Sequence, residues 1–577
     1  MDQEKPVDLK LSQEFVVSED DTDDKQIDND KVNPSTPESE NKQPLTVDRR
    51  FVEPVEPVAT VTLLPRFAKR RPSQDQWEKQ SPKQSGKNEQ KRLVIAAVGM
   101  LFAAFLGMFI NFLWPYVQNV YFAPPEVVAF RKAIKNPNWY SAKIDIEKAL
   151  DSAAKENAPM QSRASLMFDY GDALMKHKEY GEARDLFEKC SLLCAQKKLT
   201  DYQSYSQMMK GYCEHQICLQ EPSYKPNVQS IKDTLALTKS ELNDPIRVAH
   251  LLGLLGRLNA DIGQTKVAKD YLDQANAAFA KLKGQENYHR EVLDDLWKLE
   301  IQSILTDLKN KPKPPHSSLA IAHGDKAIVK QSLTLLREKK FSELNKAFDQ
   351  ATTSRIQNRS GYELVDNLRS ALSDLEAAPD KAWQDRLTLL DDWLKATPGS
   401  PIPHMVLADF YNNYAWKARG SGWGKDVNAA QWLEFKRRLY LASEQLHQAL
   451  NAGPITPEWF SIAQVNFLGA GQKRDTPMYE KIISIGLSDF PNYLPIYLNK
   501  TYYLQPRWRG TGTEWVGVIT QQADKLGGAE GDKFYARMVG FVSFLYDDVY
   551  KEAPNLSRTR VGKGNALLDK EYRQAAQ

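Results

Sequence analysis

Cysteine is scarce in this sequence and confined to one region. The 577 residues contain four cysteines, namely Cys190, Cys194, Cys213 and Cys218. Secreted scaffolds that depend on disulfides carry a much denser set, so this class is excluded. An excess of one charge is also lacking, because 77 Lys and Arg residues nearly balance 74 Asp and Glu residues. The composition therefore gives no sign of a nucleic-acid-binding protein.

Sequence patterns typical of catalysis or metal binding are absent as well. None of the eight histidines stands in a His-x-x-x-His or other metal-ligand spacing, and there is no Gly-x-Ser-x-Gly element. Asp391 and Asp392 are adjacent carboxylates, but adjacent residues on a helix do not share a face. We therefore predict no catalytic residue, no metal site and no cofactor. An enzyme is the less favoured class.

Long apolar runs are absent with one exception. Residues 93–110 read LVIAAVGMLFAAFLGMFI and contain no charged side chain. About 20 apolar residues span a bilayer as a helix, and soluble helices are rarely apolar on every face. We predict a transmembrane helix over residues 93–117. A cleaved signal peptide fits poorly, because the run begins far beyond the usual N-terminal position.

The charge that flanks this run predicts its orientation. Residues 66–92 contain nine Lys and Arg residues, whereas residues 115–130 contain none. Positive charge favours the cytoplasmic side of a membrane-spanning helix. We therefore expect a single-pass protein of the bacterial inner membrane, with the N-terminus in the cytoplasm and the C-terminal domain in the periplasm.

The segment before the run is polar. Residues 1–48 hold 14 Asp and Glu against 5 Lys and Arg, and the stretch that follows is basic. Such a chain cannot bury enough apolar surface to offset the entropy of ordering. We predict that residues 1–92 form a disordered cytoplasmic tail, acidic and then basic.

Small residues recur within the predicted membrane helix. Gly99, Ala103 and Gly107 are spaced four apart, and small residues at this spacing let two helices approach closely. They form a candidate face for a homodimer. The alternative is chance, because Gly and Ala are common in membrane helices.

Beyond residue 117 the pattern changes to amphipathic helices, with apolar residues at i, i+3, i+4 and i+7. Residues 164–190 place large and small side chains in the slots of the 34-residue tetratricopeptide pattern, and residues 249–279 repeat this order. Small residues fit where two helices cross closely. We predict an all-α fold of tetratricopeptide-like helical repeats, an α-solenoid. Its two sub-domains are residues 118–308 and 326–577, joined by a Pro- and Lys-rich linker over residues 309–325.

Two similar glycine loops interrupt the second sub-domain, RGSG at residues 419–422 and RGTG at residues 509–512. A phosphate-binding loop would require Ser or Thr after Gly424-Lys425, but Asp426 stands there. We predict that both loops connect two helices. Arginine and tryptophan, which are favoured in binding hot spots, cluster beside them. The candidate ligand surface is Trp416, Arg419, Arg507, Trp508 and Arg509. The alternative is that the tryptophans are core and the arginines cap helix ends.

The four cysteines lie on two successive predicted helices. Cys190 and Cys194 are four apart on the first helix, and Cys213 and Cys218 are on the next. Consecutive helices of such repeats pack together, so one disulfide between the pairs is a candidate in an oxidising compartment. A zinc site is disfavoured, because the usual Cys-x-x-Cys spacing is missing.

Several motifs carry a family resemblance. With LREKKFSELNKAF, LLDDWLKATPGSP, AWKARGSGW and YYLQPRWRG, residues 326–525 resemble a bacterial domain of unknown function in the tetratricopeptide superfamily. The resemblance implies helical repeats and no known reaction. Stacked repeats form an extended binding surface, so we predict a membrane-anchored scaffold or adaptor with protein or peptide partners. The alternatives are an envelope enzyme with a site between the helical domains and a transmembrane signal coupler.

Overall fold

A computed structural model describes residues 125–575 of the chain, except residues 157, 312–319, 322–325, 359, 376–377, 421–423, 472–474, 507, 511–512, 544 and 547. The predicted tail 1–92, the predicted membrane helix 93–117 and the small residues Gly99, Ala103 and Gly107 lie outside the described residues. Within the described part of the chain, no helix is both long and apolar enough to cross a membrane.

The described helices fall into two arrays. The first array contains α3 (Pro125–Ala133), α4 (Trp139–Lys155), α5 (Met160–Lys176), α6 (Tyr180–Gln196), α7 (Thr200–Gln220), α8 (Val228–Leu237), the π-helical turn η4 (Thr238–Leu242), α9 (Pro245–Asp261), α10 (Thr265–Phe279) and α11 (Glu286–Leu308). The second array contains β1 (Ala320–Ile321), α12 (Lys326–Arg337), α13 (Phe341–Ser354), β2 (Ile356–Gln357), α14 (Leu364–Ser373), α15 (Asp380–Ala396), α16 (Pro401–Arg419), the 3-10 turn η5 (Gly424–Asp426), α17 (Ala429–Ala452), α18 (Pro457–Ala470), α19 (Thr476–Asp489), α20 (Leu494–Tyr503), α21 (Glu514–Leu526), α22 (Gly528–Ser543), α23 (Val549–Glu552) and α24 (Arg558–Ala575).

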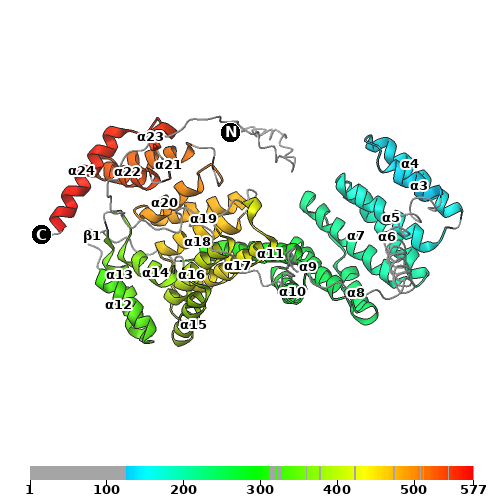
Figure 1. Cartoon of the computed structure of the whole chain (residues 1–577), viewed down its shortest axis with the longest axis horizontal. Helices are drawn as coiled ribbons and strands as arrows, with labels where there is room; N and C mark the ends of the chain where they lie inside the picture. The colour runs from blue at the N-terminus through cyan, green and yellow to red at the C-terminus, as the bar shows by residue number, and fades with distance from the viewer. Residues whose placement is uncertain are drawn as a thin grey trace, which may run out of the picture. The chain divides into compact units, whose positions relative to one another are not determined.

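Successive helices pack as the repeats of a solenoid (Figure 1). Neighbours in sequence form antiparallel pairs, and alternate helices also touch. In the first array these contacts follow the series α5, α7, α9 and α11. In the second array they follow α12, α14, α16, α18, α20, α22 and α24. Contact of each repeat with the next one along is the defining feature of such arrays, so the predicted all-α repeat fold is confirmed.

The positions that the repeat pattern reserves for small residues lie where two helices cross. A Cβ atom added at Gly171 of α5 would come within 2.3 Å of the Phe187 ring on α6. A Cβ atom added at Gly256 of α9 would lie 2.4 Å from Leu272 Cγ on α10. The glycines are therefore needed for close packing, which explains why the large and small residues recur in register.

The predicted linker contains one element that the all-α expectation omits. Ala320 pairs with Ile356 and Ile321 with Gln357 in a parallel two-residue ladder, β1 to β2. The loop that follows α13 bends to provide the second strand, with Arg355 in the left-handed backbone region. The ladder ties the end of the predicted linker to the second array.

The two arrays share a buried junction. Helix α11 packs along α17 and also touches α19. The Trp297 indole of α11 lies edge-on to Phe467, and its Nε1 donates a hydrogen bond to Asn466 Oδ1 at 2.7 Å. One continuous hydrophobic core includes side chains from Met208 to Leu556. The arrays are therefore joined by packing as well as by the chain, and the bounds of the two sub-domains stay a prediction.

Candidate functional site

The two glycine loops each connect a pair of helices, α16 to α17 and α20 to α21. Gly420 ends α16 with φ 75°, a conformation that favours glycine. Gly510 is required for a different reason, because an added Cβ would lie 1.8 Å from the Leu504 carbonyl oxygen. The next helix, α17, is capped by Asn428, which forms a reciprocal capping box with Gln431. The loops are thus built as connectors.

The tryptophans beside the two loops meet in one cluster. The Trp416 and Trp508 rings stand edge to face with centroids 5.6 Å apart. The Arg419 guanidinium lies over Trp416 at 5.6 Å and over Trp432 at 5.4 Å. No described residue accepts a hydrogen bond from the buried indole nitrogen of Trp416. This arrangement supplies a half-buried aromatic and cationic surface.

Of the two other arginines of the predicted ligand surface, the structure describes Arg509 but not Arg507. Arg509 Nη2 donates to the Gly471 carbonyl oxygen at 2.6 Å, so this arginine ties the loop after α20 to the loop after α18. Arg507 lies outside the described residues. The structure therefore brings Trp416, Arg419 and Trp508 together and gives Arg509 a structural contact. Whether this surface binds a ligand stays a prediction.

The four cysteines are free, buried thiols in the structure. Cys190 and Cys194 come together on one helix, with sulfur atoms 4.0 Å apart, whereas the expected disulfide joined two helices and involved Cys213 or Cys218. Burial raises the pKa of the Cys194 thiol to about 12, and its neighbour Cys190 adds to the rise. In this state the cysteines act as small core residues that fill the close-packed slots of the repeat.

A row of aromatic side chains crosses the first array, and sequence analysis did not identify it. We call Phe168, Tyr205, His250 and Tyr288 the aromatic row; they lie on α5, α7, α9 and α11. The Phe168 and Tyr205 centroids are 5.0 Å apart, and those of His250 and Tyr288 are 4.3 Å apart, both edge to face. Arg247 lies over the Tyr205 ring at 5.9 Å. Each of four stacked helices therefore contributes one ring to a shared surface.

Exposure of large hydrophobic side chains is confined to this array. Among the described residues, all of them lie between Val128 and Tyr288, and none lies in the second array. Tyr205 is 37% exposed and Tyr288 is 48% exposed. Single exposed apolar residues are ordinary, but an aromatic set gathered on one helix series is typical of a binding surface.

Carboxylates lie beside the aromatic row. Asp169 and Asp172 are exposed on α5, and neither forms an ion pair with a described residue. Partial desolvation raises the pKa of both carboxyls, and Asp172 adds to the rise at Asp169. The nearby Lys176 opposes the rise at both carboxyls, and Arg131 also opposes it at Asp169. Burial raises the pKa of Tyr205, and the negative charge of Asp172 contributes next. The α5 carboxylates and the α7 phenol thus share one surface.

A buried ionic network occupies the core of the second array. Arg369 of α14 donates to Asp409 of α16 and, at 3.3 Å, to Asp366. Ser373 Oγ donates to Asp409 Oδ2 at 2.6 Å, and Tyr493 Oη donates to Asp366 Oδ1 at 2.5 Å. Helices α14, α16 and the start of α20 are therefore joined by charge-assisted hydrogen bonds.

Two further carboxyls extend the network. Arg355 donates two hydrogen bonds to Glu363, the fully buried N-cap residue of α14. Burial raises the pKa of Glu363 to about 7. The hydrogen bond from Arg355 opposes this rise, and the negative charge of Glu458 adds to it. Burial also raises the pKa of Glu458, whose two carboxyl oxygens have no hydrogen-bond partner among the described residues. Perturbed carboxyls of this kind often mark functional sites, but burial closes this cluster to a ligand, so we assign it a structural role.

The network has a weak sequence signal. Asp366 and Arg369 stand three apart inside an apolar helix, and Asp409 interrupts the apolar run MVLADFY. Charged residues at positions where a helix faces the core indicate that these residues are buried and paired with one another. In the described part of the chain, no group of three His, Cys, Asp or Glu side chains is arranged to hold a metal ion.

The class follows from the helix packing: this is a tetratricopeptide-like helical repeat protein. Residues 329–456 match the family model described as "Domain of unknown function (DUF4034)", a segment that includes the first glycine loop and most of the buried network. No curated protein matches the chain.

Two solved structures are similar to the chain. A crystal structure of the APC/C hetero-tetramer Cut9-Hcn1 shares 11% identity, covers 79% of this chain and 98% of its own, and has a TM-score of 0.21. A circular tandem repeat protein with novel repeat topology shares 12% identity, covers 78% and 95%, and has a TM-score of 0.14.

Proposed function

We propose that this protein is a membrane-anchored scaffold whose repeat arrays lie outside the cytoplasm and bind an extended segment of a partner protein. The apolar run at residues 93–117 and the nine basic residues of 66–92 support the anchor and its orientation. The stacked helices support the scaffold role, because such arrays present a long surface and no enclosed site.

The aromatic row is the observation that supports binding at a particular place. It combines four rings on alternate helices of the first array with partial exposure of Tyr205 and Tyr288. Tyrosine offers large contact area with few rotatable bonds, which is why it is enriched in protein interfaces. The second array exposes no comparable side chain among its described residues, so binding is expected on the first array.

Charge indicates the chemistry of the partner. Asp172 lies one helical turn from Phe168 and near Tyr205. Lys176 lies near Asp172, and Arg131 and Lys176 lie near Asp169, but neither carboxylate forms an ion pair in the described chain. A segment with an arginine or lysine would pair with these carboxylates, and its apolar groups would pack on the rings of the aromatic row. We therefore propose a partner segment that is extended and basic.

A double substitution tests this proposal. The full chain carrying Tyr205→Ser and Tyr288→Ser is compared with wild type for proteins that co-purify from solubilised membranes after crosslinking. Tyr140→Ser on α4 is the matched control, because Tyr140 is 76% exposed and lies outside the row. We expect loss of a specific basic partner in the double variant and its retention in the control.

The proposal is wrong if the double variant and the Tyr140 control retain the same partners in the same amounts. A second variant, Asp169→Asn with Asp172→Asn, tests the charge. It should weaken binding at least tenfold at low salt, because exposed charges act most strongly when screening is low. Equal binding by this variant would refute the basic character of the segment.

A further inference from the structure

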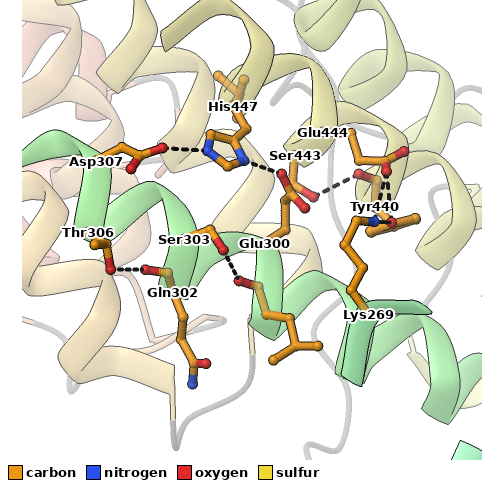
Figure 2. A network of polar contacts seen from close by, with 12 residues as sticks. Lys269, Glu300, Gln302, Ser303, Thr306, Asp307, Tyr440, Ser443, Glu444 and His447 are labelled. Atoms are coloured by element: carbon orange, nitrogen blue, oxygen red, sulfur yellow. Dashed lines mark hydrogen bonds and ion pairs between the residues drawn. The ribbon is translucent and has the colours of Figure 1, made fainter. Parts of the chain in front are cut away.

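One histidine lies between two carboxylates at the junction of the arrays. His447 of α17 places Nδ1 2.5 Å from Glu300 Oε1 and Nε2 2.7 Å from Asp307 Oδ2, both on α11 (Figure 2). Glu300 is buried, whereas Asp307 is partly exposed. Figure 2 shows the His447 ring between the two carboxylates, which lie about two turns apart on α11.

The chemistry of imidazole makes this arrangement depend on a proton. A neutral imidazole has one N–H and one lone pair, so it donates to one acceptor only. Both carboxylates therefore receive a hydrogen bond only from the imidazolium ion. When His447 is neutral, one ring lone pair faces a carboxylate oxygen, and that contact becomes repulsive unless the side chains separate.

We propose that the α11–α17 junction is a pH-responsive latch, closed by the imidazolium form of His447 and loosened when His447 loses its proton. This inference is independent of what the first array binds. Loosening would weaken the polar contact between α17 and the last turns of α11, whose apolar side chains Ile301, Ile304 and Leu308 remain in the core. The arrays would stay docked through Trp297, which lies one turn earlier on α11 and remains in the core.

A second set of polar contacts between α10 and α17 lies beside the histidine. Lys269 of α10 donates to Tyr440 Oη at 2.6 Å and lies 3.3 Å from Glu444 on α17. Tyr440 in turn donates to Glu444 at 2.8 Å. Their ion pairs and hydrogen bonds form the second part of the network in Figure 2.

Further charged groups lie on the same helices. Asp273 of α10 lies 3.4 Å from Lys269, and Lys436 of α17 pairs with Asp294 of α11 at 2.9 Å. Arg437 of α17 is near enough to His289 of α11 to lower its pKa, after burial, which is the larger cause. His289 accordingly favours its neutral form, so His447 is the junction group positioned to gain and lose a proton near neutrality.

The direction of the pH effect follows from linkage. The hydrogen bond to Glu300 raises the pKa of His447, with Asp307 adding to it and burial opposing. A raised pKa in the closed state means that the latch is fully effective below the ordinary histidine value of about 6.5. Its contribution disappears as pH rises through the closed-state value, so the latch weakens toward alkaline pH.

Hydrogen exchange on the full chain tests the latch. Protection factors, corrected for the intrinsic pH dependence of exchange, are measured between pH 5.5 and 8.5 for peptides covering residues 300–308 and 443–452. We expect protection to fall with rising pH by up to about tenfold per pH unit, the limit for one linked proton. His447→Gln, which cannot be protonated, should show low protection at every pH.

Two comparisons keep the test decisive. His404→Gln is the matched control for the peptides covering residues 300–308, because His404 of α16 contacts Gln445 of α17 at 2.8 Å and has no hydrogen bond to α11; it should retain the wild-type profile there. Glu300→Gln removes one carboxylate and should move the transition to lower pH. The latch is refuted if His447→Gln retains the wild-type pH profile, if His404→Gln abolishes it, or if Glu300→Gln leaves its midpoint unchanged.

Discussion

Replacing Asp409 by asparagine tests whether the buried ionic network holds the second array together. Asp409 is fully buried and accepts hydrogen bonds from Arg369 and Ser373. Asparagine keeps the volume but removes the charge. Arg369 would then depend on Asp366, which lies at 3.3 Å and already accepts from Tyr493. Its guanidinium would be left buried with too little compensating charge.

The expected decrease in the free energy of unfolding follows from this uncompensated charge. Removing one partner of a buried ion pair costs about 3–5 kcal/mol, because the remaining charge cannot regain its hydration. An exposed ion pair at i,i+4 contributes about 0.3–0.5 kcal/mol. The surface pair of Lys381 and Asp385, 3.4 Å apart on α15, is therefore the control. Asp385→Asn should change the free energy of unfolding by less than a fifth of the Asp409→Asn effect.

Urea unfolding followed by tryptophan fluorescence is the assay, because Trp383 and Trp393 are buried in the same array. The triple variant Asp366→Asn, Arg369→Met, Asp409→Leu removes all three buried charges and should be more stable than Asp409→Asn, since buried charges replaced together by uncharged groups cost less than one charge left without its partner. The reasoning is refuted if Asp409→Asn costs no more than the surface control, or if the triple variant is the least stable.

Three further predictions concern packing, thiols and topology. Gly171→Val should cost about 1–3 kcal/mol in thermal or urea unfolding because its side chain would overlap Phe187, whereas Gly181→Ala, with open space around it, should cost less than 1 kcal/mol. The thiol of Cys194, with its pKa raised to about 12 by burial, should react with Ellman's reagent only after unfolding; rapid reaction of the native protein would contradict this. A periplasm-only reporter fused after Phe130, and separately at the C-terminus, should be active at both points; activity of a cytoplasm-only reporter instead would reverse the orientation.

The repeat fold could be predicted from sequence because its signals are local. Gly171 and Phe187, or Gly256 and Leu272, lie within one helical hairpin, so the alternation of small and large residues records their contact directly. The glycine loops could be assigned as connectors for the same reason, since the left-handed backbone at Gly420 is a local requirement.

The polar networks could not be predicted, because their partners are distant in sequence. Asp366 and Arg369 are spaced like an ordinary surface pair, and only contact with Asp409 and with Tyr493, 127 residues away, shows that they are buried. His447 belongs to no motif, and its partners lie 140 and 147 residues earlier. Such contacts are set by how the arrays dock, which helical periodicity does not encode.

The aromatic row was missed for a related reason. Phe168, Tyr205, His250 and Tyr288 come from four helices with unequal spacing, so no repeat period aligns them in the sequence. Aromatic residues in helices are usually core, and the exposure of Tyr205 and Tyr288 emerges only after the helices stack.

The claim that the first array binds a partner is tested most directly by photo-crosslinking in cells. A photoreactive amino acid is placed at position 205 in the full chain, and separately at position 140, which is more exposed but lies outside the aromatic row. The account predicts a discrete adduct at position 205 that disappears when Asp169 and Asp172 are replaced by asparagine, and no such adduct at position 140. The same adduct at both positions, or none at position 205, would contradict it.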